Sequence, residues 1–346
     1  MRKLTLLILL GVLTGLGLAC QPVRHEDKSS QPYAEPLVWP QSAVRPRIRY
    51  VQSIARPSDV GIRRSFLARM MNAILGEEEL SFVRPGGVAA RGDVLFVADP
   101  GARALWIINA SKNQFKGVQK AGAQQLVSPV AVAPGPDSGV FLADSYLAKI
   151  LLYDAQGELL DSIVHEQLQR PAGVAYDVTA ARLYVADSGA HRIWVFDRDG
   201  RLVGAIGERG ADRGQFNFPT HVTVGPQGTL HVTDALGFRI QAFDRGGRFL
   251  YAFGHHGNAS GDLAAAKGVA VDSEGHIYVV DALFDTVQIF DATGTYLMRF
   301  GERGTAAGQF WLPGGLYING QNRIYVADAY NQRIQVFEYL ASSDDG

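Results

Sequence analysis

The stretch VADSGAHRIWVFD (residues 185–197) contains two apolar runs, and Asp187 stands where the first run ends. Both runs have the β-branched and aromatic residues that are typical of strands, so the stretch predicts a β-hairpin. Asp187 is either a catalytic carboxylate or a part of a repeated architecture. The rest of the chain distinguishes these two interpretations.

Versions of this stretch recur along the chain. An apolar run ends in an aspartate at six positions, with spacings of 45, 43, 47, 47 and 47 residues: Asp99, Asp144, Asp187, Asp234, Asp281 and Asp328. Six residues after each aspartate, an aliphatic residue opens a second apolar run. A period in this range indicates a repeated structural unit.

The repetition favours a structural role for these aspartates. An aspartate at such a turn accepts backbone N–H bonds, which explains its recurrence without any chemistry. The residue before the second run is basic in four of the six copies, which predicts a contact with the aspartate across the turn: Lys149, Arg192, Arg239 and Arg333.

Each predicted hairpin has one short apolar strand before it and, in most copies, another after it. Four strands per unit and six units are the plan of a six-bladed β-propeller, an all-β fold. The last unit stops after its third strand, RIQVFEYL (333–340), whereas RIRYVQSI (47–54) matches the pattern of a fourth strand. We therefore predict one propeller over residues 47–340, with residues 47–54 closing the ring because an incomplete blade would leave open sheet edges.

The units resemble NHL repeats. The last unit is the closest copy, with Pro313, Gly315, the run IYVAD (324–328), Asn331 and the run RIQVF (333–337). The loop GERGADRGQFNFP (207–219) recurs as GERGTAAGQFWLP (301–313), also in the manner of this family. The resemblance covers residues 85–340, or 47–340 with the closing strand. It implies that the turns between second and third strands share one face with the loops that enter the first strands, around the mouth of a central channel.

That face is where a function is expected. Its predicted turns and loops carry apolar residues at places where polar ones are usual: Tyr146, Leu147, Leu236, Phe238, Leu283, Phe284, Trp311 and Tyr330. Such residues indicate a surface that a protein partner or an extended ligand covers. The alternative is that they pack against neighbouring blades.

An enzyme is the competing interpretation. NHL-like propellers include the peptidyl-hydroxyglycine amidating lyases, which hold zinc with histidines near the channel, but the corresponding positions here contain no histidine: Gly86, Val130, Ala172, Thr220, Lys267 and Gly314. Gluconolactonase-like hydrolases bind a divalent cation through acidic and amide side chains at the channel mouth, where this chain offers no acidic residue. The best polar candidates at the mouth are Thr220, His221, His255, His256 and Lys267. We therefore predict no metal and no cofactor, with a metal-dependent lyase or lactonase-like hydrolase as the alternative.

The amino-terminal segment MRKLTLLILLGVLTGLGLAC (1–20) has a basic start, an apolar run and a terminal cysteine. It predicts a secretion signal over residues 1–19. Cys20 is the only cysteine, and its place resembles the lipobox of bacterial lipoproteins, in which the cysteine is lipidated and becomes the first mature residue. Gly17 departs from the aliphatic residue usual in that motif. Residues 20–46 contain five prolines and predict an extended tether, and residues 341–346 form a polar tail.

One segment lies outside the repeat. RRSFLARMMNAILGEEE (63–79) has apolar residues at helical spacing along one stripe and predicts a short amphipathic helix inserted in the propeller. This helix packs on the propeller body or docks a partner or a membrane interface.

The bulk composition excludes one class of function. The 346 residues are 47% hydrophobic with a formal net charge of −1, which describes a folded body without the basic surplus expected of a nucleic-acid-binding protein. The sequence therefore predicts an exported, lipid-anchored and non-catalytic binding or assembly module at the bacterial cell envelope. It would face the periplasm or the cell exterior.

Overall fold

The computed structural model describes residues 36–41, 45–62 and 80–341. All of them belong to the compact unit Tyr33–Gly346. The predicted signal peptide 1–19, the lipidation site Cys20, the predicted helix 63–79 and residues 342–346 of the polar tail lie outside the described residues.

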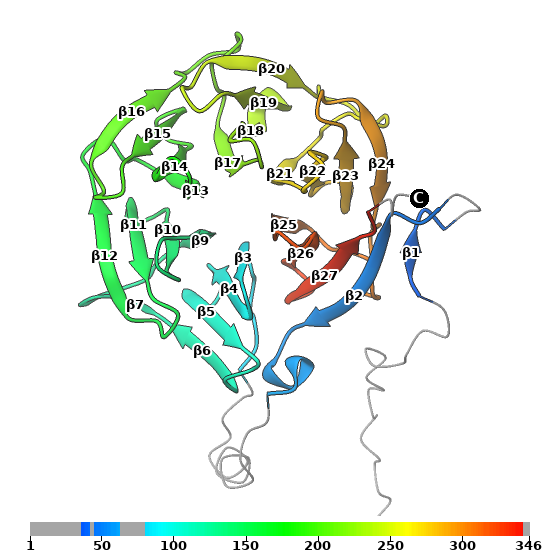
Figure 1. The fold of residues 1–346 in the computed structure, drawn as a ribbon, viewed down its shortest axis with the longest axis horizontal. Coiled ribbons are helices and arrows are strands. Elements are labelled where there is room, and N and C mark those ends of the chain that lie inside the picture. The colour runs from blue at the N-terminus through cyan, green and yellow to red at the C-terminus, as the bar shows by residue number, and fades with distance from the viewer. Residues whose placement is uncertain (1–35, 42–44, 63–79, 342–346) are drawn as a thin grey trace, which may run out of the picture. The chain divides into compact units, whose positions relative to one another are not determined.

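The described residues form six antiparallel sheets that stand around one axis (Figure 1). We number these sheets as blades 1–6 in chain order. The strands of the first three blades are as follows: β3 (Gly87–Arg91), β4 (Val94–Asp99), β5 (Ala104–Asn109) and β6 (Gln114–Val118) in blade 1; β9 (Pro129–Pro134), β10 (Val140–Asp144), β11 (Lys149–Tyr153) and β12 (Leu159–Val164) in blade 2; β13 (Pro171–Asp177), β14 (Arg182–Asp187), β15 (Arg192–Phe196) and β16 (Leu202–Ile206) in blade 3.

The remaining blades follow the same order of strands. They consist of β17 (Pro219–Val224), β18 (Leu230–Asp234), β19 (Arg239–Phe243) and β20 (Phe249–Phe253) in blade 4; β21 (Ala266–Val271), β22 (Ile277–Asp281), β23 (Thr286–Phe290) and β24 (Tyr296–Phe300) in blade 5; β25 (Pro313–Ile318), β26 (Arg323–Asp328), β27 (Arg333–Tyr339) and β2 (Ile48–Ile54) in blade 6. The short strands β7 (Lys120–Ala121) and β8 (Gln124–Gln125) form a separate hairpin. Two single-turn 3₁₀ helices complete the list, η2 (Pro57–Val60) and η3 (Ala235–Gly237). The prediction of an all-β, six-bladed propeller is confirmed.

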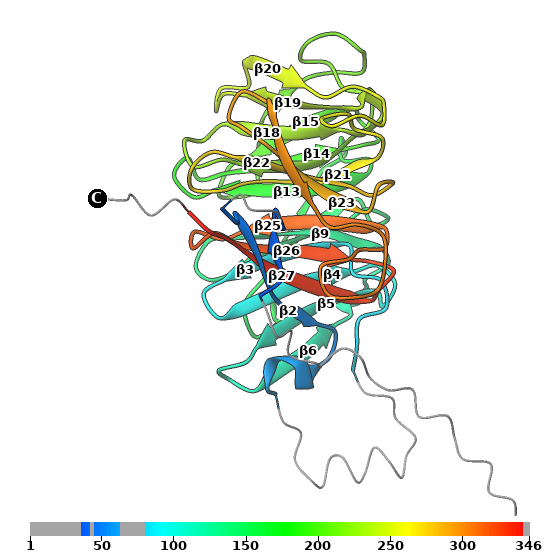
Figure 2. The same cartoon turned by 90° about the vertical axis from the view of Figure 1, so that its right-hand side faces the viewer.

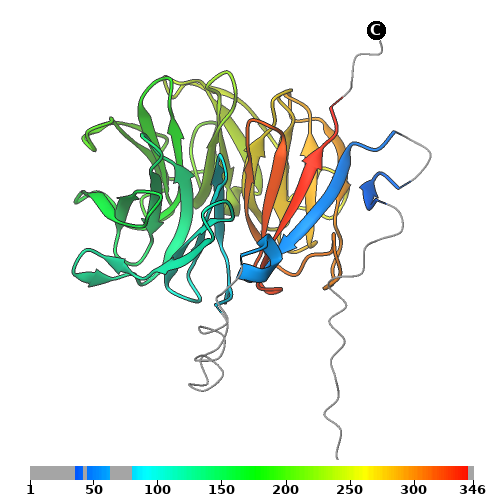
Figure 3. The ribbon, with the colours of Figure 1, turned by 60° about the horizontal axis from the view of Figure 1, so that its bottom comes forward.

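The last blade is closed by a strand from near the amino end. β2 pairs antiparallel with β27, from Ile48 opposite Tyr339 to Ile54 opposite Ile334. Figure 3 shows β2 (blue) beside β27 (red), although the two are far apart in the sequence. The predicted closing strand is therefore confirmed, and β27 is paired on both sides.

A fifth strand lies on the outer edge of blade 6. The sequence predicts a tether over residues 20–46, but within it Val38–Trp39 forms β1, which pairs with β2. The Trp39 ring stands 5.8 Å from the ring of Phe300 and 5.7 Å from that of Phe337, between their centres. These apolar contacts explain why the chain joins the sheet earlier than its proline content indicates.

The position of each strand in its blade follows its hydropathy. First strands lie nearest the axis and fourth strands form the circumference (Figure 1). The third strand β5 is buried along its whole length, whereas the fourth strand β12 is largely exposed. Apolar clusters fill the space between neighbouring blades; Tyr184 of blade 3, for example, packs with Val222 and Phe243 of blade 4. The strands run across the ring from one face to the other (Figure 2).

Candidate functional site

Each repeat aspartate joins the two kinds of loop that make one face of the ring. Asp187 is fully buried, and its carboxylate accepts backbone N–H bonds from Gln169 and Arg170 in the loop that enters β13, both at 2.8 Å. It also accepts N–H bonds from Gly189 and Ala190 in the turn between β14 and β15, at 3.0 and 3.1 Å. We call the face made by these turns and entering loops the turn face. The structural interpretation of Asp187 is thus supported by where its hydrogen bonds go.

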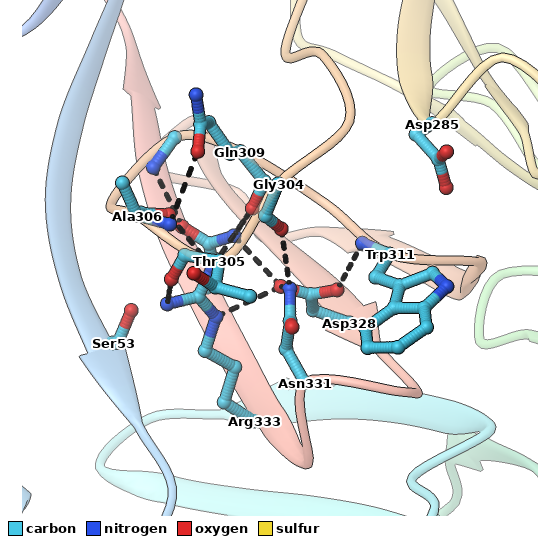
Figure 4. Close-up of polar contacts among 12 residues, drawn as sticks. Ser53, Asp285, Gly304, Thr305, Ala306, Gln309, Trp311, Asp328, Asn331 and Arg333 are labelled. Carbon is cyan, nitrogen blue, oxygen red and sulfur yellow. Dashed lines mark hydrogen bonds and ion pairs between the residues drawn. The ribbon is translucent and has the colours of Figure 1, made fainter.

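The predicted basic partners of these aspartates are present in two blades. Arg333 donates from Nε to Asp328 at 2.8 Å, and Arg239 donates to Asp234 at 3.0 Å (Figure 4 shows the first). In the other two copies the basic residue goes elsewhere, because Lys149 bonds Gln124 and Arg192 lies over the Trp194 ring. Burial raises the pKa of Asp328 and of Asp234, and the hydrogen bonds that each carboxylate accepts act in the opposite direction.

Blades 4–6 carry longer loops on the turn face, and buried side chains of the third strands hold them. The Arg333 guanidinium donates to the carbonyls of Thr305, Ala306 and Gln309 at 2.7–2.9 Å (Figure 4). Gln335 donates to the Gln309 carbonyl at 2.6 Å and accepts the Gly308 N–H bond at 2.9 Å. Gln241 and Gln288 make the equivalent bonds in blades 4 and 5. The glycine-spaced loops are therefore fixed to the sheets rather than free.

The predicted partner surface is exposed at most of its positions. Five of its eight side chains are exposed: Tyr146 (76%), Leu283 (62%), Leu236 (53%), Tyr330 (51%) and Trp311 (40%). Leu147, Phe238 and Phe284 are half-buried, and the Phe238 ring packs on His256 with 4.5 Å between ring centres. The alternative interpretation, packing within the propeller, thus applies to Phe238 and not to the five exposed residues.

Most of the exposed residues gather over adjacent blades. Leu236, Leu283 and Tyr330 each stand two residues after the aspartate of blades 4, 5 and 6, and Trp311 with exposed Leu312 belongs to the loop that enters β25. The Trp311 and Tyr330 rings lie 5.7 Å apart between centres. We call these five residues the apolar arc. Blades 1 and 3 have glycine at the same turn position, where a Cβ would approach the entering loop to 2.9 Å.

The polar candidates near the axis divide into two groups. Thr220, His221 and Lys267 lie together on the adjacent first strands β17 and β21: His221 Nδ1 is 3.2 Å from Thr220 Oγ1, and the pKa of His221 is lowered to about 3 by burial and by the charge of Lys267. His255 bonds Asp262 at 2.7 Å, and His256 packs on Phe238. The structure therefore supports a cluster of the first three residues and gives the two loop histidines other partners.

Blade 4 has a polar patch that reasoning along the sequence missed. His221 lies opposite Thr233 and Thr223 opposite His231, so all four side chains leave the same face of the sheet. That face meets blade 5, because Thr233 Oγ1 donates to the Lys267 carbonyl at 2.8 Å. In the other blades the position of His231 is aromatic: Phe96, Phe141, Tyr184, Tyr278 and Tyr325.

His231 is unusual in its bonding as well as its position. It is 4% exposed and its Nε2 lies 3.1 Å from the Tyr251 hydroxyl, whereas its Nδ1 is the only buried side-chain nitrogen or oxygen in the described residues that has no hydrogen-bond partner. Burial lowers the pKa of His231 to about 4. Laying the six blades over one another residue by residue would have shown these substitutions.

Metal and membrane features were sought in the same part of the chain. Among residues 36–41, 45–62 and 80–341, no three His, Cys, Asp or Glu side chains converge so as to hold a metal ion. No helix within these ranges has the length and apolar character needed to cross a membrane.

Comparisons with known proteins agree with this architecture. The NHL repeat family model matches residues 168–196 and 310–337, which contain the first three strands of blade 3 and most of those of blade 6. A comparison with curated proteins found no match.

Solved structures share the fold at low sequence identity. A structural genomics protein of unknown function from Bacteroides thetaiotaomicron VPI-5482 is 16% identical, with a TM-score of 0.59 over 74% of this chain and 70% of that one. A streptogramin B lyase is 13% identical, with a TM-score of 0.56 over 75% and 96%. The hydrazine synthase of Kuenenia stuttgartiensis is 14% identical, with a TM-score of 0.54 over 78% and 98%. These similarities concern the fold alone: the chain contains NHL repeats at residues 168–196 and 310–337 and has the fold of a six-bladed β-propeller.

Proposed function

We propose that this propeller is a non-catalytic binding module that holds a protein partner or an extended ligand on its turn face. The observation that carries the proposal is the apolar arc. Its side chains are exposed on backbone that buried Asp, Arg and Gln side chains hold in place. A preformed apolar surface binds without a large cost for ordering its loops.

Exposed apolar residues elsewhere on the ring differ from the arc. Leu160, Val203 and Leu297 are exposed singly, each on the fourth strand of a different blade. Single exposed aliphatic side chains are normal on protein surfaces, whereas a contiguous group indicates an interaction site. In the arc the Trp311 and Tyr330 rings come together in blade 6, and Leu236 and Leu283 stand at the same turn position in blades 4 and 5.

The test compares two matched triple variants in capture from native membranes. Leu236→Ser/Leu283→Ser/Tyr330→Ser changes the arc, and Leu160→Ser/Val203→Ser/Leu297→Ser makes a similar change on the circumference. We expect the arc variant to lose most of the captured partner, about tenfold or more, since each buried large apolar side chain contributes about 1–2 kcal/mol at an interface. The circumference variant should capture as the wild type does. Equal capture by both variants would refute the proposal.

An enzyme acting near the axis is the second candidate. It is favoured by one observation, the neutral imidazole of His221 in contact with Thr220 beside the Lys267 ammonium. Stoichiometric zinc or calcium in protein purified from its native cells, lost in a His221→Gly variant, would support this candidate. Metal that stays in that variant, or protein purified without metal, would favour the binding module.

The proposal includes export and anchoring. Residues 1–19 are the signal and Cys20 carries the lipid, which would place the module at the bacterial cell envelope. The support is the basic, apolar and cysteine-terminated order of residues 1–20. A Cys20→Ser variant is expected to move from the membrane fraction to the soluble fraction after cell lysis. Retention of this variant at the membrane would contradict lipid anchoring.

A further inference from the structure

Three exposed cations lie at the entries to first strands, on the turn face. Arg84 and Arg170 directly precede the strand-opening prolines of blades 1 and 3, and Lys267 is the second residue of β21 in blade 5. Blades 1, 3 and 5 alternate around the ring (Figure 1), so the three residues belong to first strands, or to the loops that enter them, spread around the axis. We call them the basic triad.

The basic triad has no carboxylate partner in residues 80–341. The Arg170 guanidinium lies over the Phe218 ring, 6.0 Å from its centre, and neither Arg84 nor Lys267 pairs with an acidic side chain in that range. This differs from the opposite face, where Arg198 pairs with Asp137 and Arg248 with Asp244. Unpaired cations that share one surface leave a positive potential there.

The carboxylates of the turn face do not offset this potential at its centre. The six repeat aspartates are fully buried and accept N–H bonds, and buried Asp285 accepts the Leu312 N–H bond at 2.6 Å. The residues flanking the entries to the first strands include no acidic side chain. The exposed carboxylates belong to the longer loops between blades: Glu166, Glu208, Asp212 and Glu302. Two of these, Glu208 and Glu302, accept side-chain hydrogen bonds from Gln215 and Gln309 in their own loops.

Polar groups accompany the cation of blade 5. Thr220 and His221 stand on the adjacent strand β17, and the first strands of blades 6 and 1 carry the small residues Gly314 and Gly86 at the equivalent place. A charged group of a ligand can therefore approach Lys267 with hydroxyl and imidazole groups beside it and no bulky side chain from blades 6 and 1.

We propose that the ligand of the turn face is an acidic peptide segment. Its carboxylates contact Arg84, Arg170 and Lys267, and its apolar side chains lie on the apolar arc. This inference rests on the proposed function and adds the chemistry of the partner to it. Three separate cations, with one blade between each and the next, suit discrete carboxylates, whereas a nucleic acid needs a continuous row of phosphate contacts. Leucines in the arc likewise suit apolar side chains better than a polyphosphate backbone.

The experiment uses the full-length protein and a defined probe. The probe is a fluorescently labelled random copolymer of glutamate and tyrosine, followed by fluorescence anisotropy, with polyglutamate, a lysine–tyrosine copolymer and heparin as comparison polymers. We expect poly(Glu,Tyr) to bind more tightly than polyglutamate, and poly(Lys,Tyr) not to bind. Binding of poly(Glu,Tyr) should weaken at higher salt, because salt screens exposed charges.

Two triple variants each remove three positive charges, one from the turn face and the other from the opposite face. Arg84→Gln/Arg170→Gln/Lys267→Gln removes the basic triad, and Lys112→Gln/Arg198→Gln/Arg248→Gln removes the same charge from the opposite face. We expect about a tenfold loss of poly(Glu,Tyr) affinity in the first variant, as for three exposed ion pairs, and little change in the second. All six side chains are exposed, and thermal unfolding checks that both variants are folded.

The outcomes separate this inference from the proposed function. Unchanged affinity in the triad variant, no binding of poly(Glu,Tyr) to the wild type, or equally tight binding of heparin would each overturn the acidic-peptide assignment; the last would make the face a general polyanion site. If the triad variant still captures the native partner while the arc variant does not, the turn face binds a partner of other chemistry. If both variants capture it, the proposed function itself is wrong.

Discussion

At the scale of single residues, one buried carboxylate determines where an exposed side chain stands. The aspartate at the end of each second strand bonds the N–H groups of the turn two and three residues later, as Asp281 does with Leu283 and Phe284. It also bonds the loop that enters the first strand, through the N–H groups of Ala264 and Ala265. The buried aspartate thereby holds the turn that carries an exposed side chain, here that of Leu283.

The first prediction concerns Asp187. In Asp187→Ala, four backbone N–H groups and the Trp194 indole N–H lose their acceptor. We expect the free energy of unfolding in urea to fall by about 3 kcal/mol or more. Asp197→Ala is the control, since that aspartate accepts its bonds in an exposed turn and its loss should cost under about 1 kcal/mol. Similar losses in both variants would contradict the role assigned to Asp187.

At the scale of elements, the six blades share one strand order but differ in the side chains that lie between neighbouring blades. Five neighbouring pairs of blades meet through apolar side chains, whereas blade 4 turns two histidines and two threonines toward blade 5. The smallest of the apolar clusters, built around Val269 and Phe290, lies at this junction. Burial disfavours the charged form of an imidazole. Acid should therefore destabilise the junction between blades 4 and 5 before the other junctions.

The second prediction follows from the sign of that shift. The pKa of His231 in the folded protein, about 4, lies below the usual 6.5, so the unfolded chain binds the extra proton first. Stability is then fully present above pH 6.5 and is lost as the pH falls toward 4, by at most about 3 kcal/mol from this group. Burial and Lys267 lower the pKa of His221 as well and extend the loss toward pH 3.

Variants isolate this contribution from other titrating groups. Hydrogen bonding to Asp272 raises the pKa of His276, so that pair adds stability at low pH and loses it as the pH rises, which opposes the trend. His231→Phe, which restores the aromatic residue of blades 1 and 2, should flatten the dependence of unfolding free energy on pH between 6.5 and 4. Exposed His256→Gln should leave the slope as in the wild type. A slope unchanged in His231→Phe would show that His231 is not its source.

The sequence predicted the repeated elements well and the differences between them poorly. The period of the aspartates and the fourth-strand pattern of residues 47–54 are local signals, so the blades and the closing strand followed from them. Gln241, Gln288 and Gln335 hold their loops through hydrogen bonds to residues about 26 positions away. No local sequence pattern predicts such contacts. Of the basic triad, only Lys267 was among the predicted polar candidates; Arg84 and Arg170 were missed because nothing in their local sequence distinguishes them from other surface residues.

At the scale of the whole molecule, stability depends on a pairing between the two ends of the described chain. β2 buries Ile48 and Ile54 almost completely and covers β27, whose Val336 and Phe337 are buried. Arg49 and Glu338 form an ion pair across the same two strands. Without β2, blade 6 would end in an unpaired edge strand with apolar side chains exposed.

The third prediction tests this closure by truncation. Deleting residues 1–54 removes β1 and β2, and we expect the midpoint of thermal unfolding to fall by at least about 10 °C, since two buried isoleucines alone contribute about 4 kcal/mol. Deleting residues 1–35 keeps both strands and should leave the midpoint near that of the full chain. Circular dichroism during heating measures both. The same midpoint for the two truncated proteins would show that β2 is dispensable.

The order in which the chain is made gives the closure a further consequence. In the order of synthesis β2 comes before every strand of blades 1–5 and must wait for β27, which follows them all. Until then two strand edges stay open, and such edges invite aggregation and proteolysis. A polypeptide that stops before Arg333 never hides them. Closure of the ring therefore needs residues from both ends of the propeller, so the last blade is completed only after all the others.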